Sequence, residues 1–229
     1  MIVPIVEEAE WAEHLEKLTV WATPQLPTLL IAPHPDDETL GAGGLIAALR
    51  QRGIPVNVVA VTDGESAYGN DASLGRLRRE EQENALQLLG VERRAISRFC
   101  LPDSNVSEYE EALIELLTPL ASKNRHVLAP WVGDFHPDHE ACGRAARKVT
   151  HQTGAKLTYY LFWTWHRGTP RLLDDVNLVR FPLDREAHIA KVSALQCHRS
   201  QLHNSSGDPI LTAELLGPVW RPYEVFVTT

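Results

Sequence analysis

The sequence predicts an α/β fold: one Rossmann-like domain of three layers, residues 1–229, built on a mostly parallel sheet. Two observations predict it. Short apolar runs alternate with amphipathic stretches of helical length, which is typical of repeated βαβ units. Residues 54–61 are apolar almost throughout, as expected of a parallel strand that is covered on both faces. The chain of 229 residues, 44% of them hydrophobic, is also long enough to bury a single core.

The individual elements follow from the same patterns. Strands are expected at residues 28–33, 54–61, 95–101, 126–130, 157–163 and 224–228. Helices are expected at residues 8–20, 40–51, 74–89, 108–121, 138–150 and 184–198, with a polar loop at 199–206. Glycines at 41, 43 and 44 begin one helix, but they lack the spacing of a dinucleotide-binding loop. They favour close packing of that helix against the sheet.

Charge and cysteine content exclude several classes of partner and compartment. A formal net charge of −8 argues against nucleic acids and anionic membranes, which are bound mainly through Lys and Arg. The three cysteines, Cys100, Cys142 and Cys197, lie too far apart in sequence for a CxxC motif or a disulfide framework. The sequence also shows neither a secretory signal nor an apolar segment of about 20 residues. We therefore expect a cytoplasmic protein without a membrane span.

The strongest chemical signal is the turn that follows the first buried strand. His34 and Asp37 offer a nitrogen and an oxygen ligand three positions apart, a pairing that suits zinc. Asp36 lies between them and should point elsewhere, which favours a role as a base toward a water molecule. The alternative is a polar turn in which Asp36 only caps the next helix.

A second cluster at residues 134–139 can complete a metal site, because catalytic zinc needs about three protein ligands and one open position. His136 and His139 lie three residues apart at the start of a predicted helix, so both can face the site. The positive end of that helix disfavours a charged imidazole, which suits a neutral ligand. A lone histidine there would more often be a cap or a surface residue.

Together the two clusters resemble the LmbE-like, or PIG-L-type, family of zinc-dependent N-deacetylases. The resemblance rests on Ala-Pro-His-Pro-Asp-Asp-Glu at 32–38 and His-Pro-Asp-His at 136–139. Weaker agreement comes from Thr62-Asp63-Gly64-Glu65, Arg78, Leu101-Pro102-Asp103, Lys191 and His198-Arg199-Ser200-Gln201, so that residues 28–201 are covered.

The resemblance implies a metal site at the carboxyl edge of the strands and a role for each matching residue. The implied metal ligands are His34, Asp37 and His139. They would hold Zn²⁺, although two histidines and a carboxylate also suit Fe²⁺. Asp36 would act as the general base. His136, oriented by Asp138, would stabilise the oxyanion or protonate the leaving amine.

The implied substrate is a small N-acetylglucosamine conjugate: a glycoside, a sugar-inositol, a sugar-lipid or an antibiotic precursor. Arg78 and Asp103 match substrate-contacting positions, against the alternatives of a solvated helix face for Arg78, Glu80 and Glu81 and a simple turn at Asp103. Trp163 and Trp165 are candidate walls for a sugar ring, or else core residues.

One departure and two other functions stay open. Some family members carry a tyrosine where this chain has Asp134, and an anion there could not donate a hydrogen bond to an oxyanion. The same metal site could serve an amidase acting on another amide, such as a mycothiol conjugate. A catalytically silent metal-binding or sugar-binding module is the third reading, although such a module has no use for a base such as Asp36. A homo-oligomer is also left open.

Overall fold

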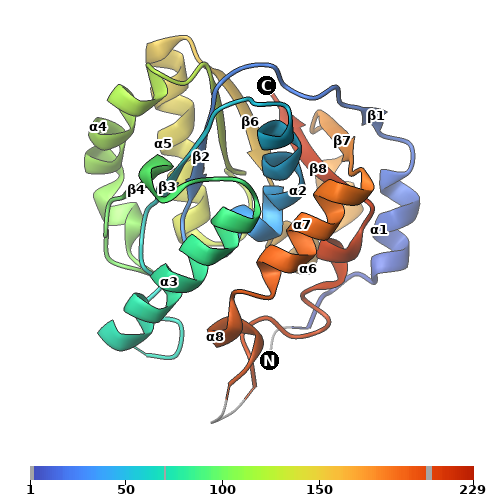
Figure 1. Ribbon diagram of the computed structural model, residues 1–229. Helices are drawn as coiled ribbons and strands as arrows, with labels where there is room; N and C mark the ends of the chain where they lie inside the picture. Colours follow the sequence, from blue (N-terminus) through green and yellow to red (C-terminus); the bar gives the residue numbers. More distant parts are fainter. Residues whose placement is uncertain (1–2, 70, 205–207) are drawn as a thin grey trace.

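The chain folds around an eight-stranded sheet with the order β1-β7-β8-β6-β5-β2-β3-β4 (Figure 1). This computed structural model describes residues 3–69, 71–204 and 208–229. The strands are β1 (Thr19–Val20), β2 (Thr28–Ala32), β3 (Val56–Ala60), β4 (Ile96–Arg98), β5 (His126–Pro130), β6 (Lys156–Tyr160), β7 (Leu178–Pro182) and β8 (Tyr223–Thr228). Among the described strands, β8 alone runs antiparallel to its neighbours. The predicted mostly parallel α/β sheet is thus confirmed.

Helices cover both faces of this sheet and give the expected three layers (Figure 1). They are α1 (Glu8–Leu15), α2 (Asp37–Gln51), α3 (Ala72–Leu88), α4 (Glu110–Ala121), α5 (Pro137–Thr153), α6 (Thr164–Arg167), α7 (Arg185–Leu195) and α8 (Arg199–Leu202). Side chains of β2 alternate between two cores: Leu29 and Ile31 pack with α1, α4 and α5, while Leu30 and Ala32 pack with α2, α3 and α7. All five β2 residues are buried, as in a strand covered on both faces.

The strand order reverses between β2 and β5, which are neighbours in the middle of the sheet. After β2 the chain moves outward to β3 and β4, whereas after β5 it moves the other way to β6. Loops that leave two such strands diverge and open a crevice at their carboxyl ends, where α/β proteins bind ligands. The two histidine clusters follow β2 and β5, so the topology brings them together.

Several element boundaries differ from the predictions. The helix expected at 8–20 ends at Leu15, and residues 19–20 form β1 instead. The sequence patterns also missed β7 and α6, and the strand expected at 157–163 ends at Tyr160. Residues 199–202 of the expected loop form α8, while residues 205–207 of that loop lie outside the described part of the chain. Short elements are hard to predict because two to five residues are too few to show a periodic pattern.

Of the glycines of α2, Gly41 packs against the sheet as expected, whereas Gly43 and Gly44 face Lys191 of α7 and Leu183. A Cβ at Gly41 would overlap the ring of Tyr160 on β6, so the glycine is needed for the helix to lie close to the sheet. The Tyr160 hydroxyl donates to the carbonyl of Ile31, 2.9 Å away, on β2. This hydrogen bond ties β6 to β2 close to the first cluster. Within the described residues, the helices are all too short or too polar to cross a membrane.

Candidate metal and catalytic site

The two clusters meet in a cavity of 160 Å³ at the carboxyl end of β2 and β5. It is lined by polar residues, among them His34, Asp36 and His136, and by apolar ones that include Leu40 and Phe162. Backbone strain also gathers in the surrounding loops. Positive φ angles occur at Asp36 (153°), Ser104 (67°) and Phe135 (55°). Residues other than glycine rarely adopt such angles, and when they do it is often at functional sites.

The three expected metal ligands converge. Oδ2 of Asp37 lies 3.1 Å from Nδ1 of His34 and 3.2 Å from Nε2 of His139. These three residues form one of the two groups in the described chain that could hold a metal ion. Two imidazole nitrogens and one carboxylate oxygen are the donor set of many catalytic zinc sites. The residues therefore fit the ion that the sequence implied.

His139 is prepared as a ligand by Asp134. The Nδ1–H of His139 donates to Asp134 across 2.8 Å, which leaves Nε2 as the free nitrogen. That Nε2 is buried and has no hydrogen-bond partner among the described residues. An unpaired buried nitrogen is costly, so a cation at this position would satisfy it. The Asp134 carboxylate is not among the residues that line the cavity, so a hydrogen-bond donor for an oxyanion has to come from another residue.

Asp134 is also tied to the backbone. Its carboxylate accepts hydrogen bonds from the backbone N–H groups of Phe162, Trp163 and Thr164 and from the Thr164 hydroxyl. The carboxylate thus lies at the start of α6, where the helix dipole favours an anion. It is fully buried. This arrangement fixes the position of His139 relative to β6.

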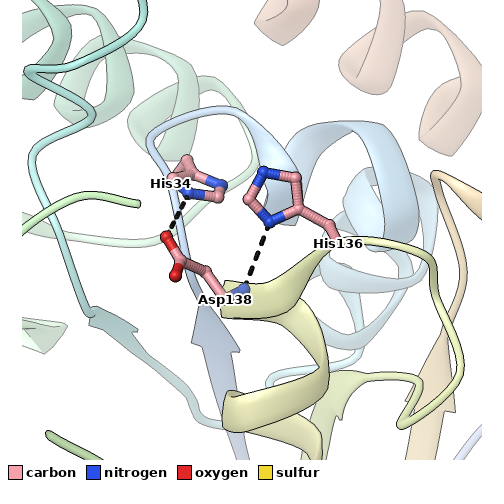
Figure 2. Close-up of side chains that lie close together, drawn as sticks. All are labelled: His34, His136 and Asp138. Atoms are coloured by element: carbon pink, nitrogen blue, oxygen red, sulfur yellow. Dashed lines mark hydrogen bonds and ion pairs between the residues drawn. The ribbon is translucent and has the colours of Figure 1, made fainter. Parts of the chain in front are cut away.

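The second candidate group consists of His34, His136 and Asp138. Figure 2 shows that the carboxylate of Asp138 points at His34, whose Nε2 is 3.1 Å away, and not at His136. Its oxygens also accept the N–H groups of Ser104 (2.8 Å) and Val106 (3.0 Å). The carboxylate of Asp138 therefore does not contact His136, and the bond between these two residues runs from the Asp138 backbone N–H to Nδ1 of His136. Because the carboxylate already has three donors, the group with Asp37 and His139 fits a metal better.

The electrostatics of the site favour a cation. Burial alone would lower the pKa of both His34 and His139. Hydrogen bonds with Asp103, Asp138 and Asp37 nevertheless raise the pKa of His34 well above its usual value. The charge of Asp37 and the bond to Asp134 raise the pKa of His139 to about 9. Four carboxylates around two imidazoles thus create an excess of negative charge, which a bound metal ion would neutralise.

Asp36 is held apart from the metal ligands by Arg78. It occupies the N-cap position of α2, yet its side chain makes no capping bond. Nη2 of Arg78 instead donates to Oδ2 of Asp36 (3.1 Å) and to the carbonyl of Pro35, while Nη1 donates to the carbonyl of Gly64. Burial raises the pKa of Asp36 to about 7 despite the positive charge of Arg78. The side chain of Asp36 therefore does not cap the helix. A carboxyl group whose pKa lies near 7 suits a general base.

Arg78 and Glu81 are not a solvated helix face. Arg78 is 4% exposed and Glu81 is 6% exposed. A Cβ at Gly64, which has φ of +65°, would overlap the guanidinium of Arg78. Glycine in the Thr62-Asp63-Gly64 turn thus makes room for the arginine. Arg78 lines the cavity, and its contact with a substrate stays a prediction.

His136 has a defined tautomer. Its Nδ1 accepts the backbone N–H of Asp138 at 3.3 Å, so the proton of the neutral ring is on Nε2 (Figure 2). Burial, with the charges of His34 and His139, lowers the pKa of His136 to about 3. The ring stacks on Trp163 at 5.8 Å between centroids and 21° between planes. His136 therefore caps α5, as the simpler reading had it, and also lines the cavity with an N–H donor.

The other candidate substrate residues have mixed outcomes. Asp103 lines the cavity, lies 3.2 Å from Nε2 of His34 and accepts the backbone N–H of Ser66. It is not a simple turn residue. Trp163 also lines the cavity, whereas Trp165 packs edge-on against Trp11 in the core and is 4% exposed. The expectation of Trp165 as a wall for a sugar ring is wrong.

Comparison with known proteins agrees with this geometry. Residues 29–150 match the model of the PIG-L family, described as GlcNAc-PI de-N-acetylase. The chain belongs to the PIG-L family. A relative in Bacillus subtilis (strain 168), a probable N-acetyl-alpha-D-glucosaminyl L-malate deacetylase 2, is 30% identical over 186 residues, 76% of this chain and 82% of its own length. The resemblance inferred from the two histidine motifs is thereby confirmed.

One further relative and one solved structure extend the PIG-L comparison. A 1D-myo-inositol 2-acetamido-2-deoxy-alpha-D-glucopyranoside deacetylase of Corynebacterium glutamicum (strain R) is 29% identical over 222 residues, with 76% of this chain and 74% of the relative covered. The crystal structure of the A40926 pseudoaglycone deacetylase Dbv21 superposes with a TM-score of 0.72 over 90% of this chain and 97% of that one, at 21% identity. The latter likeness confirms the fold.

Two residues of the site escaped the sequence analysis. The sequence shows Asp134 only as an anion that cannot donate a hydrogen bond, although carboxylates commonly orient ligating histidines. Gln201 enters the sequence comparison only as the last residue of the His198-Arg199-Ser200-Gln201 match, yet it is almost fully buried and lines the cavity. Its isolated position in a polar stretch carries no signal of this role.

Proposed function

We propose that this protein is a metal-dependent hydrolase that removes the N-acetyl group from a small N-acetylglucosamine conjugate. One observation carries the proposal: the buried Nε2 of His139, which has no hydrogen-bond partner among the described residues, lies beside Asp37, and Asp37 and His34 line a cavity together with a separate carboxylate, Asp36. A binding module would need the first feature but not the second. The N-acetylglucosaminyl deacetylases among the relatives support the substrate class.

The metal would be held by His34, Asp37 and His139, with Asp134 and Asp138 orienting the two imidazoles. Zn²⁺ is the ion we propose, and Fe²⁺ also suits this donor set. When bound, the ion supplies Lewis acidity, which polarises a carbonyl and acidifies water.

The surrounding side chains would manage protons and charge. Asp36 accepts the proton of the attacking water, and Arg78 holds its carboxylate in place through the 3.1 Å contact. His136 donates from Nε2–H to the amide oxygen as negative charge develops on it. The C–N bond then breaks as the nitrogen takes up the proton that Asp36 accepted from the water, so that the free amine and acetate are released.

The test is a panel of N-acetylated substrates with separate assays of acetate and free amine. It should contain N-acetylglucosamine linked to malate, to inositol and to a methyl aglycone, together with N-acetylated amines and amino acids that lack a sugar. We expect equimolar acetate and amine from at least one sugar conjugate and turnover at background on the sugar-free amides. Hydrolysis of the sugar-free amides alone would contradict the substrate class. No release of acetate by the metal-loaded protein would contradict the reaction.

A further inference from the structure

A second polar group in the cavity is left without a partner. Gln201 on α8 is 1% exposed and lines the same cavity as His34, Asp36 and His136. Its Oε1 is buried and has no hydrogen-bond partner among the described residues. Buried carbonyl oxygens are nearly always paired, and an unpaired one at a cavity wall is a place for a donor on a ligand.

The orientation of this amide follows from its neighbours. The Ser200 hydroxyl donates to Oε2 of Glu81 across 2.6 Å, and the Ser200 backbone N–H donates to Oε1 of Glu81 across 2.8 Å. The hydroxyl proton is therefore used, so Ser200 Oγ can only accept. Nε2 of Gln201 lies 2.9 Å from Oγ and must be the donor. The chain Glu81–Ser200–Gln201 thus makes the free atom of the amide an acceptor, which removes the usual ambiguity between its oxygen and nitrogen.

The rest of Gln201 is equally fixed. Its backbone carbonyl accepts the N–H of Leu211 at 3.0 Å, so α8 is tied to the segment that forms another wall of the cavity. Nearby lining residues such as Leu40, Phe162 and Leu211 are apolar and buried, and they offer no side-chain donor to Oε1. The acceptor is therefore preorganised at a place where the protein leaves it unpaired.

We infer that Oε1 of Gln201 accepts a hydrogen bond from a hydroxyl group of the substrate sugar and so helps to determine specificity. This inference rests on the proposed function for the identity of the substrate, but it adds a residue that selects a hydroxylated ring over other N-acetylated amines. A site built to bond one hydroxyl discriminates strongly against the analogue that lacks it, because its own polar group is then left unpaired.

The experiment combines one variant with a series of deoxy sugars. Gln201→Met keeps the length of the side chain and removes the acceptor. The probes are methyl N-acetylglucosaminide and its 3-, 4- and 6-deoxy analogues. With the wild-type protein, one deoxy analogue should lose about tenfold in kcat/KM, the size of a single neutral hydrogen bond. In Gln201→Met, kcat/KM for the parent sugar should be lower than in the wild type by the same factor. For the affected deoxy analogue, kcat/KM should be the same in the variant as in the wild type.

Calorimetric binding of the same four sugars gives the comparison without turnover. It separates the two claims: sugars that bind with the predicted Gln201 dependence but release no acetate would contradict the proposed reaction alone. Equal affinity and equal kcat/KM of wild type and Gln201→Met for all four sugars would overturn the inference. So would equal losses on all four, which would indicate a general structural defect or a bond to the amide N–H that all of them share.

Two further variants control the result. Ser200→Ala keeps the Gln201 amide but removes the partner that orients it, so we expect a smaller loss with the same preference among the deoxy sugars. Gln87→Ala, on the exposed side of α3, should match the wild type in both measurements. If Ser200→Ala lowered kcat/KM without sparing the same deoxy analogue as Gln201→Met does, the orienting role of the Glu81–Ser200–Gln201 chain would be contradicted.

Discussion

Two histidines near opposite ends of β5 are both buried, but one lies among hydroxyl groups and the other among carboxylates. His126 begins β5 and is 3% exposed, while His139 follows the other end of the same strand and is fully buried. Both ring nitrogens of His126 lie within hydrogen-bond distance of threonine hydroxyls, at 3.1 Å from Thr28 and 3.0 Å from Thr158. His139 uses one nitrogen on Asp134 and leaves the other bare beside Asp37.

Burial alone therefore does not mark a functional histidine, whereas an unused ring nitrogen among carboxylates does. Burial and the charge of Lys156 lower the pKa of His126 to about 4, so this ring is neutral near pH 7 and its hydrogen bonds are satisfied. For His139 the neighbouring carboxylates overcome the effect of burial. The first histidine contributes to stability, and the second is available to a metal.

The largest expected effect comes from substituting each of the two histidines separately. His139→Ala should lose stoichiometric metal and reduce deacetylation to background, because one of three ligands is gone. His126→Asn should keep both metal and kcat while lowering the free energy of unfolding. Metal analysis by mass spectrometry, read beside activity, distinguishes the two. Wild-type metal occupancy in His139→Ala would refute the ligand assignment.

The next effect separates the base from the ligands. Asp36→Asn should lower kcat by roughly 10²- to 10⁴-fold, the usual contribution of a general base, while metal content stays at the wild-type level. Arg78 should still be able to hold the neutral amide oxygen. Unchanged kcat at full occupancy would remove Asp36 from the proposed mechanism.

A smaller effect is expected from the partner of His139. Asp134→Asn should weaken metal affinity by about 10- to 100-fold, as is usual when a residue behind a ligand is changed. The affinity can be measured by competition with a chelator. Because Asp134 also accepts backbone N–H groups at α6, Thr164→Val serves as a matched control that removes one of those contacts and spares His139. Equal metal affinity of Asp134→Asn and the control would show that Asp134 acts only on α6.

The smallest expected effect concerns stability and pH at the other edge. The pKa of His126 is about 4 in the folded protein and ordinarily about 6.5 when unfolded, so between these values the unfolded state binds the extra proton. The stability that the neutral His126 ring contributes is thus fully present above pH 6.5, and it is lost as the pH drops toward 4. The loss from this residue is about 2 kcal/mol at pH 5. Urea unfolding at pH 7 and pH 5 should show a smaller decrease for His126→Asn than for wild type, and equal decreases would contradict this.

The structure could be predicted from the sequence where a local hydrophobic pattern and metal-ligating residues occur together. The buried strands β2 and β5 and the polar turns after them were predictable, because apolar runs that end in metal-ligating residues are an unusual combination. The set His34, Asp37 and His139 was implied by the family resemblance, and its convergence depends on β2 and β5 being neighbours in the sheet, which the sequence patterns did not predict.

What could not be predicted depends on contacts between distant segments. The carboxylate of Asp138 bonds to the loop at Ser104 and Val106 instead of to His136, and no local spacing indicates this. The two residues of β1 are exposed and pair with β7, a strand that the sequence patterns also missed. The role of Gln201 depends on Glu81, which lies 120 positions earlier in the chain and reaches it through Ser200.

Anomalous X-ray diffraction at the zinc edge, on crystals of the zinc-loaded protein, tests the central assignment most directly. We predict one strong peak within about 2.0–2.2 Å of Nδ1 of His34, Oδ2 of Asp37 and Nε2 of His139. A peak held by His136 and Asp138, with Nε2 of His139 still unliganded, would contradict it.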